Sequence, residues 1–405
     1  MSGAALSAIR AACDGVARVG VAVSGGGDSV AALVLAVEAL GADRVAAVTV
    51  DHGLRPEAAD EAAGVAALCA GLCVAHDVLR WQAGPQGGNL MDEARRARMA
   101  LIGAWAAGRV EAVILGHTQD DQAETLLMRL ARGSGVDGLS AMEAARAAHG
   151  VLWLRPFLSV TRAELRSELV ARGIGWVEDP SNADPRFQRV RARQALAALQ
   201  GLGISAAGLA ETTGRMRRAR AALEAATQAA LDSLVVADRG TLVIGGAASA
   251  LPAEIRDRLF AHLLMDLAGA AYRPRHDDLR RLIDAGQGTL MGCVLAPEGA
   301  GWRLWREARA VEGLRVAAGA LWDGRWRAEG AGATEIAALG EAGLVQLSRQ
   351  AQAGQHAHWR ETGLPRAALA GLPGLWRGGE LVAAPLAFWP QGWRLEARPV
   401  TTICH

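Results

Sequence analysis

The sequence contains no lysine among its 405 residues, so all 43 of its basic side chains are arginine. This absence excludes a Walker-type phosphate loop, which requires a lysine. Arginine binds phosphate with a planar fork and stacks on bases better than lysine does, which suits a nucleic-acid ligand. The abundance of alanine, glycine and arginine is also typical of a GC-rich codon bias, and we favour that explanation for the composition as a whole.

Cysteine is also scarce, because only five residues are scattered along the chain without metal-ligand pairs. They indicate neither a disulfide framework nor a zinc site, so we expect a reducing, cytoplasmic setting. The N-terminal residues lack the pattern of a signal peptide, and no apolar run reaches the length of a membrane span, so we expect no membrane partner. The net charge of +1 excludes a uniformly basic nucleic-acid surface but allows local basic patches.

The first 200 residues alternate short apolar, β-branched runs with amphipathic helical patterns. This alternation predicts an α/β fold with a parallel sheet and helices on both of its faces. In such sheets, ligands bind beyond the carboxyl ends of the strands. We expect strands over residues 19–23, 45–50, 74–81 and 112–115, and helices over 30–40, 58–71, 89–107 and 119–132.

The remaining sequence divides into two parts of different character. The first is mostly helical in pattern, with a long helix over 206–234 and one strand over 241–244. The second is rich in glycine and tryptophan and predicts a compact β-rich or mixed domain, with Trp376, Trp389 and Trp393 in its core. With 51% apolar residues the chain can bury several cores. We predict three domains, over residues 1–200, 203–310 and 311–405.

The most informative segment is a glycine loop between the first predicted strand and the helix after it. Its glycines permit backbone conformations that are closed to other residues. The amides at the helix start, with the positive end of the helix dipole behind them, predict binding of an anion such as phosphate. An ordinary strand-to-helix turn remains the alternative, because it also favours glycine and serine. The loop reads Ser24-Gly25-Gly26-Gly27-Asp28-Ser29.

Asp28 is the unexpected residue of this loop, because a carboxylate repels a phosphate. It indicates instead that the loop holds Mg²⁺ or orients the reacting partner. Polar clusters at residues 51–55 and 116–124 follow two further predicted strands. Because the carboxyl ends of parallel strands lie at one edge of a sheet, we expect all three clusters to converge.

The cluster at 116–124 contains an imidazole and two carboxylates at the start of a predicted helix. Asp121 and Glu124 are three residues apart and share a helix face, with His117 at the preceding strand end. Such a group can bind Mg²⁺, hold a cationic substrate or move protons. A well-capped helix start is the alternative, because acidic residues favour helix N-termini. The position opposite a phosphate loop favours a functional site.

A basic segment over 186–193 places four arginines beside Phe187. Clustered arginine next to an aromatic residue suits contact with a nucleotide phosphate or with nucleic acid. A solvated helix face is the alternative, since basic runs alone are weak signals.

These motifs together resemble the tRNA(Ile)-lysidine synthases, a family within the N-type ATP pyrophosphatases (PP-loop enzymes). The ordered match extends over roughly residues 19–195, and a weaker one continues from Arg275 to Val294, where the family carries a helical tRNA-binding domain. The chain departs from the family at Met99, Val190 and Ala192, where Tyr, Asn and Ile are usual. The matching segments are 24–29, 51–55, 94–98, 117–125, 155–158 and 179–193.

The resemblance implies that lysine is joined to C2 of the wobble cytidine of an isoleucine tRNA with a CAU anticodon. The cytosine oxygen would attack the α-phosphate of ATP and expel pyrophosphate, and the lysine ε-amine would then displace AMP. The implied ATP-binding residues are Ser24, Gly25, Gly26, Gly27, Asp28, Ser29, Val50 and His52, with Asp28 and Asp121 for Mg²⁺. The implied catalytic residues are Asp28, Asp121, Glu124, His117, Arg98 and Arg189.

Three alternatives remain at this point. A PP-loop tRNA thiolase acting on cytidine would carry a Cys-x-x-Cys pair near residues 89–107, which contain no cysteine. A small-molecule ligase would leave the basic helical domain without a purpose. A non-catalytic nucleotide-binding or tRNA-binding protein would need none of the carboxylates. The sequence decides neither between a monomer and a homodimer nor whether residues 311–405 contact the tRNA acceptor stem.

Overall fold

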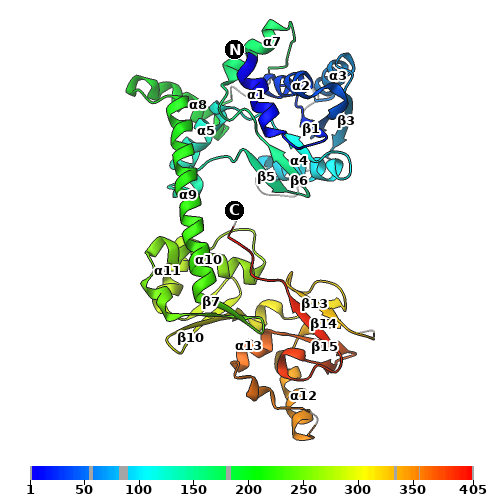
Figure 1. Ribbon diagram of the computed structural model, residues 1–405, viewed down its shortest axis with the longest axis vertical. Coiled ribbons are helices and arrows are strands. Elements are labelled where there is room, and N and C mark those ends of the chain that lie inside the picture. The colour runs from blue at the N-terminus through cyan, green and yellow to red at the C-terminus, as the bar shows by residue number, and fades with distance from the viewer. Residues whose placement is uncertain are drawn as a thin grey trace. The chain divides into compact units, whose positions relative to one another are not determined.

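A computed structural model of the chain (Figure 1) describes residues 2–53, 58–81, 90–178, 184–332, 335–354 and 356–403. The chain forms two compact units, residues 1–220 and 221–405, and the boundary between them falls within helix α9 (Ala206–Leu234). Among the described helices, none combines the length and the apolar character needed to cross a membrane.

Unit 1 is built on a six-stranded sheet with the order β3-β2-β1-β4-β6-β5. All neighbouring strands are parallel except β5, which forms an antiparallel hairpin with β6. The predicted parallel α/β fold is therefore confirmed. The strands are β1 (Val19–Ala22), β2 (Val45–Asp51), β3 (Ala75–Arg80), β4 (Ala112–Ile114), β5 (Ala145–Ala148) and β6 (Val151–Leu154).

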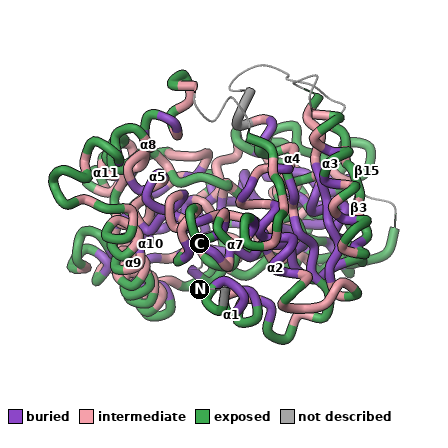
Figure 2. Tube along the Cα trace, turned by 90° about the horizontal axis from the view of Figure 1, so that it is seen from above, coloured by how far each residue is buried: buried purple, intermediate pink, exposed green. Residues whose placement is uncertain are grey.

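Helices cover both faces of this sheet because its strands are apolar on both sides. Val45 and Ala47 of β2 pack into one core with the helices α1, α2, α3 and α7, whereas Ala46 and Val48 pack into a second core with α4. Figure 2 shows buried residues along the strands and exposed residues on the outer sides of the helices. The helices are α1 (Ser2–Ala12), α2 (Gly27–Leu40), α3 (Ala58–Gly71), α4 (Leu90–Ala106), α5 (Gln119–Leu130), α6 (Val136–Leu139), α7 (Arg162–Ala171) and α8 (Gln188–Leu199).

Unit 2 begins with a five-stranded antiparallel sheet, of order β7-β8-β11-β10-β9, that packs against α10 and α11. The sequence pattern predicted only β8, because the other strands are short and because glycine or arginine interrupts β9 and β11. Helices remain prominent in this part, as expected, but the sheet is an addition to the prediction. The elements are β7 (Val235–Asp238), β8 (Thr241–Ile244), α10 (Ala253–Ala268), α11 (His276–Ala285), β9 (Gly288–Leu290), β10 (Cys293–Glu298) and β11 (Gly301–Arg306).

The rest of unit 2 has a core of its own, formed by a four-stranded and a two-stranded antiparallel sheet with two helices. Trp376, Trp389 and Trp393 are buried in this core, as predicted. The elements are β12 (Arg315–Ala317), β13 (Trp326–Glu329), β14 (Glu335–Ala338), α12 (Gly340–Gln352), α13 (Arg366–Gly371), β15 (Pro373–Arg377), β16 (Glu380–Ala383) and β17 (Arg394–Ala397).

After β17, the segment 398–403 returns to the first core of unit 2. Asp266 of α10 accepts hydrogen bonds from the backbone N–H and the hydroxyl of Thr401, at 3.1 and 2.9 Å. The backbone oxygen of Thr401 lies 2.7 Å from Nε2 of His262, and Ile403 is buried among residues of the first core. This segment therefore completes a core whose other residues lie about a hundred or more positions earlier in the chain.

Candidate active site

The glycine loop connects β1 to α2 and closes on itself through its two serines. Gly25 has a φ of 85°, a conformation that favours glycine, and Gly26 is the N-cap of α2. The backbone N–H of Ser24 donates to Oγ of Ser29 at 3.0 Å, and that hydroxyl donates to the carbonyl of Gly26 at 2.8 Å. The first turn of α2 thus presents backbone N–H groups at the carboxyl edge of the sheet, a suitable anion site.

Two close contacts fix the loop against its surroundings. The backbone N–H of Val177 donates to the carbonyl of Gly25 at 3.0 Å. Gly116, directly after β4, lies so close that a Cβ atom there would be 2.6 Å from the carbonyl oxygen of Asp28. Only glycine allows this approach, which brings the end of β4 against the start of α2.

The start of α5 follows Gly116 and carries a capping box. The backbone N–H and the hydroxyl of Thr118 both donate to Oδ2 of Asp121, at 2.8 and 2.9 Å, and the N–H of Asp121 is paired with the Thr118 hydroxyl. One oxygen of Asp121 therefore stabilises the helix start, and Oδ1 remains for other partners. Asp121 therefore caps the helix start, as the structural alternative predicted, and still has an oxygen available for a functional role.

Arg162, the first residue of α7, lies between the three predicted carboxylates. Its Nε is 3.1 Å from Oδ2 of Asp28. Its terminal nitrogens are 3.5 Å from Oδ1 of Asp121 and 3.4 Å from Oε1 of Glu124. The carboxylates thus converge on one guanidinium group from the start of α2 and from two turns of α5.

Helix α8 supplies two further arginines to the same carboxylates. Arg189 lies 3.5 Å from Oε2 of Glu124 and 3.9 Å from Oδ1 of Asp121. Arg193, one turn along α8, donates from Nε to Oε1 of Glu124 at 2.9 Å. The side chain of Glu124 is almost fully buried, at 1% exposure, so these cations balance a charge that is removed from water.

The environments of Asp28 and Asp121 shift their pKa values in opposite directions. Burial raises the pKa of Asp28 despite the nearby Arg162, and its Oδ1 is buried without a hydrogen-bond partner among the described residues. Burial also acts on Asp121, but attraction from Arg189 and Arg162 and the hydrogen bond from Thr118 bring its pKa below the ordinary value. A pair of acids with diverging pKa values is typical of catalytic sites.

His117 lies beside Asp121 but is kept neutral. Burial lowers the pKa of His117 to about 3, although Asp121 favours the charged form. Within the part of the chain that the structure describes, its buried Nδ1 has no hydrogen-bond partner. An imidazole with so low a pKa is a weak proton acceptor at neutral pH.

His52 and Arg98 belong to a neighbouring part of the same edge. His52 follows β2 and stacks edge-on against Trp81 at a centroid distance of 6.0 Å. Burial and the charge of Arg98 lower the pKa of His52, while burial, Arg95 and Arg189 lower the pKa of Arg98. Arg98 is therefore close enough to act electrostatically on both His52 and Arg189 of α8.

The structure thus brings together Asp28, Asp121, Glu124, His117 and Arg189, while the roles assigned to them remain predictions. Val50 is half-buried in the second core at the end of β2. The predicted segments 54–55 and 179–182 lie outside the described residues.

Arg162 was not predicted from the sequence. The available signal was the pattern Thr161-x-x-Glu164, a capping box that marks Arg162 as the first residue of a helix after β6. Its backbone N–H donates to Oδ2 of Asp120 at 2.7 Å, which joins the starts of α7 and α5. Arg162 and Asp28 are 134 positions apart in the sequence, so the local sequence pattern around either residue could not predict their contact.

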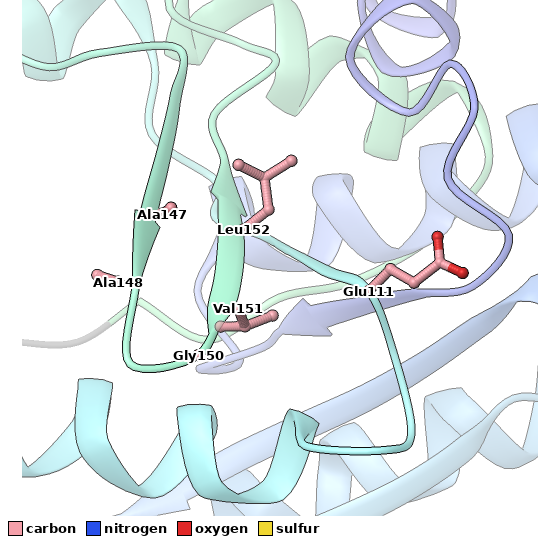
Figure 3. A pocket seen from close by; sticks show the side chains of 6 residues that line it. All are labelled: Glu111, Ala147, Ala148, Gly150, Val151 and Leu152. Atoms are coloured by element: carbon pink, nitrogen blue, oxygen red, sulfur yellow. The ribbon is translucent and has the colours of Figure 1, made fainter. Parts of the chain in front are cut away.

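A separate pocket of about 450 Å³ lies beside the β5–β6 hairpin and contains none of these residues. Its one charged side chain is Glu111, which accepts a hydrogen bond from the backbone N–H of Ala17 at 2.9 Å. Figure 3 shows the mostly aliphatic and small residues that line it. This pocket is a packing feature rather than part of the candidate site.

Comparison with known proteins identifies the family of this fold. Residues 5–199 match the family model described as the PP-loop domain, so the fold and the site define a PP-loop protein that uses ATP. The tRNA(Ile)-lysidine synthase of Ruegeria pomeroyi is 46% identical over 361 residues, which cover 87% of this chain and 84% of that protein. The chain belongs to the tRNA(Ile)-lysidine synthase family.

Two further relatives carry the same name. The protein from Rhizobium meliloti is 35% identical and aligns over 83% of this chain and 78% of its own length. The protein from Methylobacterium sp. is 40% identical over 68% of this chain and 81% of its own length. The similarity therefore extends beyond the PP-loop domain into unit 2.

Proposed function

We propose that the chain joins free lysine to C2 of the wobble cytidine of the isoleucine tRNA with a CAU anticodon, in the cytoplasm and with ATP as co-substrate. The observation that carries this proposal is the convergence of Asp28, Asp121 and Glu124 on one cation beside the glycine loop. A protein that only binds nucleotide or tRNA needs no such group of carboxylates, whereas a site for the cationic side chain of lysine does.

In the first step the cytosine O2 attacks the α-phosphate of ATP. A new oxygen–phosphorus bond forms, the bond to the bridging oxygen breaks, and pyrophosphate leaves with that electron pair. The N–H groups at the start of α2 and the dipole of that helix would stabilise the phosphates. The positive field of Arg98 and Arg189 would stabilise the charge that develops on the leaving group.

We assign a Mg²⁺ ion to Asp28 and Asp121. Within the described residues no three His, Cys, Asp or Glu side chains gather as a metal site, so the protein would supply only these two. Magnesium commonly takes one or two carboxylates together with substrate phosphates, and the unpaired, buried Oδ1 of Asp28 fits that use. When bound, the ion would neutralise charge on the departing pyrophosphate.

In the second step the ε-amine of lysine attacks C2 of the adenylated cytidine. A carbon–nitrogen bond forms, the carbon–oxygen bond breaks, AMP leaves, and the nitrogen loses a proton. Asp121 and Glu124 would bind the incoming ammonium group, and the carboxylate of Glu124 would receive that proton. His117 is buried and neutral, so we assign it a hydrogen-bonding role beside Asp121 rather than proton transfer.

The test uses the full-length protein with ATP, Mg²⁺, labelled lysine and tRNA transcripts. We expect label to enter the isoleucine tRNA with the CAU anticodon but not its methionine counterpart, and pyrophosphate release to depend on the tRNA. The proposal fails if no label enters the tRNA, or if pyrophosphate is released equally without it.

A further inference from the structure

The contacts of Arg162 differ from those of an ordinary structural ion pair. Only its contact with Asp28 is a short hydrogen bond, whereas its distances to Asp121 and Glu124 are 3.4–3.5 Å. Arg172, at the end of the same helix, is instead 2.6 Å from both Glu38 and Glu168. Arg162 therefore interacts with three carboxylates, two of them at long distance, whereas Arg172 forms short ion pairs with two carboxylates.

The backbone of Arg162 is fixed although its side-chain contacts are long. The capping box of Thr161 and Glu164 sets the start of α7, and the N–H of Arg162 donates to Asp120. Its side chain is 18% exposed, so it is in contact with solvent and does not lie in a sealed core. The guanidinium group can consequently change position by rotation about the side-chain bonds of Arg162, while the start of α7 stays in place.

Three carboxylates so close together repel one another strongly in a partly buried site. Without a cation they would separate or take up protons. Arg189 and Arg193 approach Glu124 from α8, but within the part of the chain that the structure describes, Arg162 alone forms ion pairs with both Asp28 and the α5 carboxylates. In the proposed function, the two α5 carboxylates, Asp121 and Glu124, are also the groups that bind the lysine ammonium group.

We propose that Arg162 is a positioning residue that acts as the counter-ion of the substrate-lysine site in the free protein. It keeps Asp28, Asp121 and Glu124 close together in the free protein. When the lysine ammonium group binds, Arg162 loses its contacts to Asp121 and Glu124. This inference rests on the proposed function, because it requires that Asp121 and Glu124 bind lysine. It predicts that Arg162 lowers the affinity for lysine while raising the rate of the reaction.

The experiment compares Arg162→Gln and Arg162→Lys with the wild-type chain and with Arg172→Gln as a control. Calorimetry measures lysine binding to the free protein, and the tRNA assay gives KM for lysine and kcat separately. For Arg162→Gln we expect lysine to bind about tenfold more tightly, because a competing charge is gone, and kcat to fall at least about tenfold. Arg162→Lys keeps the charge and should restore much of the wild-type behaviour. Arg172→Gln should have the same affinity for lysine and the same kcat as the wild type.

Opposite results overturn the inference. If Arg162→Gln binds lysine as the wild type does, Arg162 does not compete with the substrate. If it binds lysine more weakly, Arg162 supports the site without yielding to the ammonium group. A wild-type chain that binds lysine but incorporates none into tRNA would refute the proposed function and leave the binding comparison intact. Thermal unfolding of each variant identifies a loss of fold.

Discussion

At the scale of the residue, Asp121 combines a structural and a chemical task. One oxygen caps α5 through Thr118, and the other faces Arg162 and Arg189. The sequence indicated both possibilities without deciding between them, because an acidic residue at a helix start serves either purpose. In the structure, Oδ2 of Asp121 performs the structural task and Oδ1 is available for the chemical task. The spacing of residues in the sequence could not have predicted this division between the two oxygen atoms.

Replacing Asp121 by asparagine tests the chemical task alone. The asparagine oxygen can still accept the capping hydrogen bonds, so the melting temperature should change little. Product formation should fall at least about a hundredfold, because the negative charge facing the substrate is lost. Asp60→Asn, in the first turn of α3, is the matched control and should remain active. Turnover of Asp121→Asn close to that of the wild type would remove this residue from the mechanism.

The free thiols provide a second test at this scale. Burial raises the pKa of Cys13, Cys69 and Cys293 to about 11, whereas Cys73 is exposed. Because the thiolate is the reactive form, iodoacetamide at pH 8 should modify the native buried cysteines at least about a hundredfold more slowly than Cys73. Peptide mass spectrometry measures each site, and denatured protein shows that all can react. A buried cysteine that reacts as fast as Cys73 would contradict the described core.

At the scale of the element, the ends of β1, β4 and β6 determine the site. Each strand is followed by a helix after a connection of four to seven residues, and the helix starts are joined by Arg162 and by the close packing of Gly116 against Asp28. Hydrophobic periodicity predicted β1, β4 and the helices that follow them, but neither β6 nor α7, and the rule that ligands lie at carboxyl ends predicted that the polar clusters after β1 and β4 converge. The central place of α7 could not be predicted, since a single arginine after a capping box gives no local sign of its partners.

Gly116→Ala is expected to disrupt this packing. The new Cβ would meet backbone atoms of Asp28 at 2.6 and 2.8 Å, so the glycine loop must shift. We expect KM for ATP to rise at least about tenfold and stability to fall by about 1–3 kcal/mol, as for other overpacked sites. Steady-state kinetics and thermal unfolding measure both effects.

Gly64→Ala in α3 is the control for that substitution. Its Cβ would have open space, and alanine is the better helix former, so activity should be kept and stability should rise slightly. Equal behaviour of the two variants would show that the loop tolerates a side chain at Gly116.

At the scale of the whole molecule, the sequence predicted the first unit far better than the second. Unit 1 consists of regular strand and helix patterns, whereas the sheet in the first part of unit 2 is made of short strands such as Gly301–Arg306, where arginine and glycine interrupt the alternation. The tryptophan core beyond residue 311 was predictable from composition, but the strand pairing within it was not. Pairing in such sheets depends on contacts that are distant in sequence.

The segment 398–403 provides a test of unit 2. Removing the residues after Ala397 would expose the pocket that Ile403 fills and leave Asp266 without its bonds to Thr401. Loss of one buried aliphatic side chain alone costs about 2–5 kcal/mol. We expect the unfolding transition of unit 2 to move to lower temperature in calorimetry, while the melting of unit 1 stays unchanged. An unaltered transition would show that this segment is dispensable for the core.

The return of residues 398–403 to α10 also has a consequence for synthesis on the ribosome. Every element of unit 1 can pair with its neighbours once about 220 residues have emerged. Most of the first core of unit 2 can form from residues 230–304, but this core lacks Ile403 and the bonds from Thr401 to Asp266 until residues 398–403 have been translated. During that interval the nascent chain carries a folded first unit followed by a second unit with part of its core uncovered, and this exposed apolar surface favours aggregation.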